Sequence, residues 1–485
     1  MRVKLILPRF TQTQARSRRR INYSLWPPIG LATLAGYGRA DDEVWIEDEN
    51  VEPLELDDSP DLVGVSVAVS GARRAYEIAD HYRKRGVHVA LGGLHATAMP
   101  FEALGHADTV FLGPAEEAWP RFLGDFRARQ PRRLYRSQVR SLAEQPPVRR
   151  DVIKRHLYLA PNALVVSRGC PHRCDFCSNS SFFRGGKAFY TQTADQALAE
   201  IGRLPGRHLY FLDDHIFGDK QLARALFEAM KGTGRSWQSA ATVDSALETD
   251  LLELAVESGL RTLLVGFETI SEKSLADHGK HQNLRCDYTE AVRRFHDAGV
   301  MVNATFVFGM DDDDESVFDR TVEWALEQGI ETATFHILTP YPGTGLYHRM
   351  AADGRILTRN WDLYDTAHVV FRPARMSAAA LKAGYLRAQR DFYRWGSVLR
   401  GAATHARLRD RLRHFAYTAG WGKFETMWDF VIRSGQVGRF SPVLGALLAA
   451  SDGPIRGRIR RAEPVGARDP NAMPQGLPAP YGGQL

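Results

Sequence analysis

The chain has 485 residues, of which 44% are hydrophobic and 25% charged, and its formal net charge is +6. These are ordinary values for a globular protein, and the length predicts two or three domains rather than a single core. The arginines alternate with acidic residues instead of forming a basic stripe, so no nucleic acid partner is expected. No secretion signal or membrane-spanning stretch is recognisable, which predicts a cytoplasmic protein that does not act at a membrane.

Residues 1–126 alternate short apolar segments with amphipathic ones, the pattern of a parallel sheet covered by helices on both faces. Gly92-Gly93 follows the fourth apolar segment, where a bare backbone permits close approach of a ligand. The predicted strands are Val3–Leu7, Val44–Ile46, Leu62–Val67, Val87–Leu91 and Thr109–Leu112. We therefore expect a Rossmann-like domain over 1–126.

Residues 127–160 are rich in Arg, Pro and Gln, which predicts an exposed linker laid over the surface. A second alternating series occupies residues 161–376 and predicts another α/β domain, with helices such as Ala194–Arg203 between its strands. Its six predicted strands are Ala163–Ser167, His208–Leu212, Ser236–Thr242, Thr262–Phe267, Met301–Phe308 and Thr332–Leu338.

Three of the four cysteines follow the first strand of this series, in the sequence Cys170-Pro-His-Arg-Cys174-Asp-Phe-Cys177. Three thiolates on one short loop can each ligate one iron of a cubane cluster and leave the fourth iron open. Zinc is the alternative, but a structural zinc site needs a fourth ligand, and no second cysteine arm follows. Disulfides are disfavoured because crowded cysteines without a secretion signal indicate a reducing compartment.

The spacing C-x3-C-x2-C, with Phe176 before the last cysteine, resembles that of the radical S-adenosylmethionine (SAM) superfamily. The resemblance implies a partial (β/α)6 TIM-type barrel and a [4Fe-4S] cluster held by Cys170, Cys174 and Cys177. It also implies SAM bound at the open iron, an external one-electron donor such as flavodoxin or ferredoxin, and formation of a 5′-deoxyadenosyl radical. Phe176 is then expected beside the cofactor.

The same resemblance assigns cofactor-binding residues to the ends of the barrel strands. Asp213 and Asp214 end the second strand, where either carboxylate could accept the methionyl ammonium of SAM. Glu268 ends the fourth strand and is expected to bind the ribose hydroxyls, with a solvated acid as the alternative. Gly309 ends the fifth strand, where it would admit the adenine unless it is simply a turn glycine.

Three further residues are candidates for the chemical step. His336 and Tyr341 flank the exit of the sixth strand and could polarise a substrate hydroxyl, although a histidine on an apolar strand is commonly a core residue. Cys286 is the remaining cysteine and could donate a hydrogen atom, unless it is a bystander.

The N-terminal half resembles the cobalamin-binding domain that precedes the radical domain in many members of that superfamily. The resemblance rests on Gly92-Gly93-Leu-His95 and Gly113-Pro-Ala-Glu116-Glu117, each after a strand. The family's cobalt-binding motif D-x-H-x-x-G is absent from residues 8–24, which offer Arg16 and Arg18-Arg19-Arg20 instead. The match at Asp213–Gly218 lies in the other domain, and we interpret it as coincidence. Whether cobalamin binds is therefore left open.

Residues 377–452 are helical in pattern, with Leu381, Tyr385, Ala388, Phe392, Trp395 and Leu399 on one face. We expect this stripe to pack against the barrel; an amphipathic helix on a membrane is the alternative. Residues 453–485 are rich in Gly, Pro and Arg and are predicted to be disordered.

Two enzyme classes follow from these observations. The main hypothesis is hydrogen abstraction from a small molecule, such as a natural product, for radical dehydration, rearrangement or redox change, for example on an amino sugar. The alternative is a cobalamin-dependent radical C-methyltransferase acting on a lipid or secondary metabolite. A non-catalytic zinc or iron–sulfur scaffold is a third reading.

Overall fold

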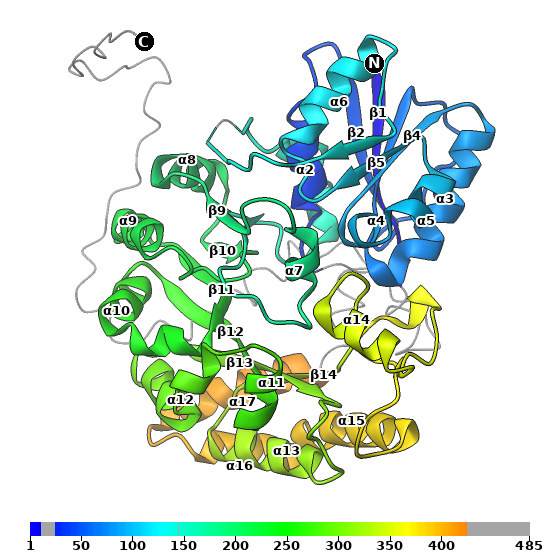
Figure 1. Ribbon diagram of the computed structural model, residues 1–485. Coiled ribbons are helices and arrows are strands. Elements are labelled where there is room, and N and C mark those ends of the chain that lie inside the picture. The colour runs from blue at the N-terminus through cyan, green and yellow to red at the C-terminus, as the bar shows by residue number, and fades with distance from the viewer. Residues whose placement is uncertain (11–24, 144, 424–485) are drawn as a thin grey trace, which may run out of the picture.

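The computed structural model describes residues 1–10, 25–143 and 145–423. Two α/β domains follow each other along the chain, drawn in blue to cyan and in green in Figure 1, and yellow and orange helices pack beside the second. The predicted tail at 453–485, and the part of the helical region beyond residue 423, lie outside the described residues.

The first domain is a six-stranded parallel sheet in the order β2-β1-β3-β4-β5-β6. Consecutive side chains of β1 point to opposite faces of the sheet. Leu5 packs in the core under α2 and α6, whereas Ile6 packs in the core under α3. The strands are β1 (Arg2–Leu7), β2 (Glu43–Asp48), β3 (Leu62–Ser66), β4 (His88–Gly92), β5 (Thr109–Leu112) and β6 (Leu134–Arg136). The helices are α2 (Ile29–Ala35), α3 (Ala72–Lys84), α4 (Leu94–Ala98), α5 (Pro100–His106) and α6 (Ala118–Arg127).

The second domain is an open six-stranded parallel sheet in the order β14-β13-β12-β11-β10-β7. Phe267, Phe306 and Phe335 stack across three adjacent strands and form part of its core. The strands are β7 (Ala163–Leu164), β10 (His208–Phe211), β11 (Ser236–Thr242), β12 (Leu260–Glu268), β13 (Met301–Phe308) and β14 (Thr332–Ile337). A separate antiparallel pair joins β8 (Ser167–Gly169) to β9 (Phe189–Thr191). This arrangement confirms the α/β class and the TIM-type partial barrel.

The helices of the second domain connect its strands and cover the sheet (Figure 1). Several begin at a side-chain cap, such as Thr193 with Gln196 in a reciprocal capping box and Asp219 at the next helix. They are α7 (Ser178–Phe182), α8 (Ala194–Arg203), α9 (Lys220–Met230), α10 (Thr249–Glu257), α11 (Glu272–Asp277), α12 (Tyr288–Asp297), α13 (Val317–Glu327) and α14 (Gly345–Ala352). Short 3-10 turns are η1 (Val69–Gly71), η2 (Arg150–Val152), η3 (Arg155–Leu157), η4 (Val243–Leu247), η5 (Asn283–Arg285) and η6 (Trp361–Leu363).

The C-terminal stripe was predicted as one continuous core face, and this is wrong in its second half. α15 (Ala378–Phe392) buries Leu381, Tyr385, Ala388 and Phe392, as expected. The helix then ends, Arg394 adopts an extended conformation, and α16 (Trp395–Ala403) begins in a new direction. Trp395 and Leu399 are consequently 50% and 58% exposed. α17 (Leu408–Lys423) follows, and no helix among the described residues is long and apolar enough to cross a membrane.

The segment 127–160 was predicted as an exposed linker, but it contains parts of both domains. Leu134–Arg136 forms β6 beside β5, and the side chain of Tyr135 is buried in the first core. Arg140 is also buried, and its guanidinium donates to the carbonyl oxygens of Phe183 at 2.6 Å and Lys187 at 2.9 Å. The segment therefore joins the first sheet to the chain around α7.

Candidate active site

Cys170, Cys174 and Cys177 lie on the loop between β8 and α7, and all three thiols are free of disulfides. Burial raises the pKa of Cys170 to about 11 and that of Cys177 to about 12, and the charge of Cys174 adds to both shifts. Thiolates so placed need a bound cation to offset their loss of solvation. Three thiols on one short loop, whose charges act on one another, fit a cluster that is ligated by three cysteines.

Asp175, inside the cysteine loop, holds the loop against the rest of the domain. Its carboxylate accepts from His278 Nδ1 at 2.7 Å and pairs with Arg349 at 2.7 Å. Its carbonyl oxygen accepts from the backbone N–H of Leu346, at the start of α14. Phe176 places its ring edge-to-face with His278, with centroids 5.8 Å apart. The loop is thus fixed from two helices, while contact of Phe176 with a cofactor stays a prediction.

The two aspartates after β10 have different environments. Asp213 is buried and accepts from the backbone N–H of Val166 at 3.2 Å and from Ser167 at 2.5 Å, so it orders the chain that leads into the cysteine loop. Asp214 is reachable by solvent, although desolvation by surrounding protein raises the pKa of its carboxyl. Its negative charge also raises the pKa of Cys170 and Cys177. Of the two aspartates, Asp214 is the one whose charge shifts the pKa of the cysteine thiols.

Glu268 ends β12 with a left-handed backbone, at φ 64°, which is rare for a residue with a side chain. Its carboxylate forms a buried ion pair with Lys280, and the side chains are only 13% and 7% exposed. The positive charge of Lys280 lowers the pKa of Cys174, counter to the effect of burial. Sequence reasoning missed Lys280, because it follows a turn glycine and belongs to no motif or periodic pattern.

Gly309 also has a positive φ, 99°, and ends β13 as predicted. A Cβ at this position would lie 2.8 Å from Leu381 Cδ2 and 3.1 Å from Phe371 Cζ. The glycine is therefore required by backbone conformation and by packing under α15. Its expected role in admitting adenine stays a prediction.

The three candidates for the chemical step lie at different places around the loop. Burial raises the pKa of Tyr341 to about 12, and the charges of Asp365 and Cys177 add to the shift. His336 Nδ1 lies 3.0 Å from the hydroxyl of Thr366. Cys286 donates to the carbonyl oxygen of Gln282 at 3.6 Å, and the amide of Gln282 in turn donates to Cys174 Sγ at 3.7 Å. Burial raises the pKa of Cys286 to about 11.

The carboxyl edge of the first sheet faces this loop. β1 lies between β2 and β3, so the strand order reverses there, and ligands of such sheets bind beyond the carboxyl ends at the reversal. Gly93 and Gly113 at this edge have φ values of 106° and 79°. The side chain of Glu116, from the first domain, accepts a hydrogen bond at 2.7 Å from Nε of Arg168 in the second domain. Arg168 lies shortly before the cluster cysteines in the sequence. α4 contacts α7 at the same border (Figure 1).

Two further features of the first domain bear on a bound corrin. His95 is fully buried, its Nε2 lies 3.1 Å from Glu102 Oε1, and its ring meets Trp361 edge-on, so it is part of the core. The loop after β1, with Arg16 and Arg18-Arg19-Arg20, lies outside the described residues, and its sequence contains no histidine. The edge thus offers glycine-rich backbone as a surface for cobalamin but no histidine from that loop as a cobalt ligand.

Three free thiols on one loop at the edge of an open parallel barrel, facing a doubly wound sheet, define a radical SAM domain joined to a nucleotide- or corrin-binding domain. Family models agree: residues 164–340 match the radical SAM superfamily and residues 22–123 match the B12 binding domain. The chain thus contains a radical SAM domain that is preceded by a B12-binding domain. The radical SAM domain implies a [4Fe-4S] cluster and SAM, and the B12-binding domain supports cobalamin as a further cofactor.

Several known proteins resemble the chain along most of its length. A bacteriochlorophyllide d C-12(1)-methyltransferase of Chlorobaculum tepidum is 27% identical, over 77% of this chain and 83% of that protein. The structure of OxsB, a cobalamin-dependent SAM radical enzyme, aligns with a TM-score of 0.63 at 13% identity, covering 92% of this chain and 75% of that one. The structure of TsrM, a radical SAM methyltransferase of Kitasatospora setae, aligns with a TM-score of 0.56 at 15% identity, covering 73% and 76%. At these identities the two structures indicate a shared fold.

Proposed function

We propose that the protein is a cobalamin-dependent radical SAM C-methyltransferase acting on a small molecule. The observation that carries the proposal is the meeting of the two domains, where Glu116, after a strand of the B12-binding sheet, contacts Arg168, directly before the cluster cysteines. A corrin at that edge and SAM at the cluster would share one space. The similarity to a methyltransferase over 77% of the chain supports the same reading.

The hypothesis of dehydration, rearrangement or redox change, which the sequence alone favoured, is not supported by the relatives. The similar proteins of known activity include methyltransferases. The absence of a histidine after β1 does not count against methyl transfer, because the glycine-rich edge can contact a corrin that has no protein ligand below the cobalt. The alternative has therefore become the main proposal.

In this proposal each residue near the thiols has one task. Cys170, Cys174 and Cys177 hold the cluster, and Lys280 offsets part of its negative charge. Asp214 accepts the methionyl ammonium, while Asp213 keeps the preceding strand in place. Glu268 accepts the ribose hydroxyls. When bound, the cluster and cobalamin supply one-electron cleavage of SAM and methyl transfer, respectively.

Tyr341 is the candidate that we place closest to the reaction. Its pKa of about 12 keeps the phenol protonated, so that it can donate a hydrogen bond to a substrate oxygen. His336 and Cys286 are retained as candidates for substrate positioning and hydrogen-atom donation. The electron is expected from an external donor such as flavodoxin or ferredoxin, and we expect the reaction to take place in the cytoplasm.

The products of SAM distinguish the two reaction classes. The protein would be reconstituted anaerobically with iron, sulfide and hydroxocobalamin, desalted, and supplied with a reductant, SAM carrying a deuterated methyl group, and a small-molecule extract of its source. Methyl transfer predicts retained cobalamin, S-adenosylhomocysteine alongside 5′-deoxyadenosine, and a product that has gained the labelled methyl group. Formation of 5′-deoxyadenosine without S-adenosylhomocysteine or labelled product would refute methyl transfer and favour dehydration or rearrangement.

A further inference from the structure

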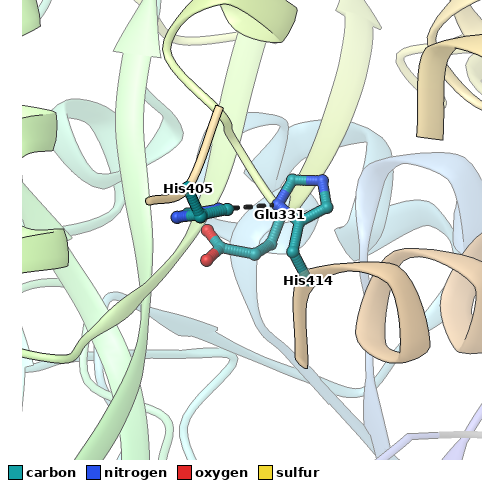
Figure 2. Close-up of side chains that lie close together, drawn as sticks. All are labelled: Glu331, His405 and His414. Atoms are coloured by element: carbon teal, nitrogen blue, oxygen red, sulfur yellow. Dashed lines mark hydrogen bonds between the residues drawn. The ribbon is translucent and has the colours of Figure 1, made fainter. Parts of the chain in front are cut away.

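A second group of metal-ligating side chains lies away from the cysteines. Glu331, His405 and His414 each direct one ligand atom toward the others, and these atoms all lie within 4.8 Å of one another. Figure 2 shows the two imidazole rings joined by a hydrogen bond and tilted by 54°, with the Glu331 carboxylate beside them. Glu331 directly precedes β14, His405 lies between α16 and α17, and His414 lies on α17.

This group is at the opposite end of the barrel from the candidate active site. Glu331 stands at the amino end of β14, whereas His336 and Tyr341 lie at or beyond its carboxyl end. The six residues of this strand span about 20 Å at the usual rise per residue. The amino end of a barrel strand is typically a place for stability rather than catalysis. The group is therefore separate from the cluster, SAM and the B12-binding edge.

The Glu331 carboxylate is held in a way that leaves one oxygen available. Its side chain is fully buried, and Oε2 accepts from the backbone N–H of Val302 at 2.9 Å and lies 3.2 Å from His296 Nε2. Oε1 has no hydrogen-bond partner among the described residues. A buried carboxylate oxygen without a partner is costly unless a cation or donor meets it. Metal-binding carboxylates are commonly held in place by hydrogen bonds to one oxygen while the other binds the metal. The fixed Oε2 and the available Oε1 of Glu331 fit this arrangement.

The two histidines complete the arrangement. His405 Nε2 and His414 Nδ1 are 3.1 Å apart. Two nitrogens bound to one tetrahedral zinc at 2.0–2.1 Å each would be about 3.3 Å apart, close to this separation. Gly401 leaves room for the His414 ring, since a Cβ there would lie 2.8 Å from its Nε2.

We propose that Glu331, His405 and His414 bind one structural divalent metal ion, with zinc as the best match to two imidazole nitrogens and one carboxylate oxygen. The ion would tie α17 and the loop before it to the amino end of β14. A direct hydrogen bond already connects the same two elements, since the Thr418 hydroxyl of α17 donates to the carbonyl oxygen of Glu331 at 2.6 Å. The competing arrangement is metal-free, with the 3.1 Å contact between His405 Nε2 and His414 Nδ1 being a hydrogen bond.

The test must separate this zinc from zinc held by the cysteine loop. Zinc content would be measured in the full chain and in a variant in which Cys170, Cys174 and Cys177 are all replaced by Ala. We expect about one zinc per chain in that variant, with an X-ray absorption spectrum that requires only nitrogen and oxygen neighbours. In the same triple-alanine background, which keeps Cys286, His405→Gln and Glu331→Gln should lower the zinc content at least tenfold. The exposed His281→Gln should leave it unchanged.

Folding defects are controlled by a reversible measurement. The triple-alanine variant would be treated with a chelator, and its Tm would be measured before and after zinc is returned. A fall in Tm that zinc reverses, absent from His405→Gln, supports the site. The proposal is overturned if the triple-alanine variant binds no zinc, or if its zinc is retained after both His405→Gln and Glu331→Gln.

Discussion

The buried pair of Glu268 and Lys280 allows the cofactor role of Glu268 to be separated from its structural role. In Glu268→Gln the amide oxygen still accepts from Lys280, but the lysine charge loses its counter-ion in a place where its side chain is only 7% exposed. Breaking a buried ion pair by removing one partner costs about 3–5 kcal/mol. Because one acceptor remains, we expect a loss in unfolding free energy of about 3 kcal/mol. Loss of a charge-assisted bond to ribose should also weaken SAM binding about ten- to a hundredfold.

The matched double variant Glu268→Gln/Lys280→Met removes the stranded charge. Urea unfolding should show recovery of most of the lost stability, because an apolar side chain of similar length replaces the buried cation. Calorimetric titration with SAM, on protein with its cluster assembled, should still show weak binding in the double variant. SAM affinity equal to that of the wild type in the double variant would refute the ribose contact. Unchanged stability in Glu268→Gln would refute the energetic importance of the pair.

Three further outcomes are expected. Cys174→Ala should abolish reductive cleavage of SAM, because each thiolate of a three-cysteine cluster is needed; 5′-deoxyadenosine at the wild-type level would contradict the cluster assignment. Asp214→Asn should weaken SAM binding at least about tenfold in the same titration with little change in stability, and wild-type affinity would move the ammonium contact elsewhere. Burial raises the pKa of Asp313 to about 6 from 3.8, so the folded state keeps this proton to higher pH than the unfolded chain, and stability falls as the pH rises through that interval. Asp313→Asn, whose amide oxygen can still accept from Gly309 and Met310, should reduce this slope and stabilise the protein at pH 7 by at most about 3 kcal/mol; an unreduced slope in urea unfolding at several pH values would contradict this account.

The parallel sheets were predictable because their strands are continuous apolar runs between helical segments. Ser236–Thr242 and Met301–Phe308 have the same bounds in the structure as in the prediction. β6 was missed because it has only three residues between arginines and prolines, and only Tyr135 enters the core. The turn at Arg394 was missed because a helical stripe can continue in sequence across a break in the backbone.

Some features of the candidate site were also predictable from the sequence, and others were not. The cysteine spacing and the strand-end position of Glu268 are local features, which a sequence displays directly. The difference between Asp213 and Asp214 was not predictable, because it depends on which carboxylate meets the backbone of Ser167, a neighbour only in space. The ion pair of Lys280 with Glu268 was not predictable for the same reason, because the two side chains meet only in space. The roles of these side chains depend on contacts between distant parts of the chain rather than on residue type.

The segment 127–160, with β6 and Arg140, restricts how this protein could exchange parts with its relatives. A joint placed before β6 would make β5 depend on a strand from the other enzyme, and a poor match would leave an open sheet edge, which invites pairing with other chains. A joint placed after Arg140 would keep the sheet but would make α7 depend on a guanidinium from a foreign partner for the carbonyl oxygens of Phe183 and Lys187. A hybrid that combines the B12-binding half of one enzyme with the radical half of another would therefore have to preserve both contacts. Recombination between such enzymes should succeed only where those two contacts are matched.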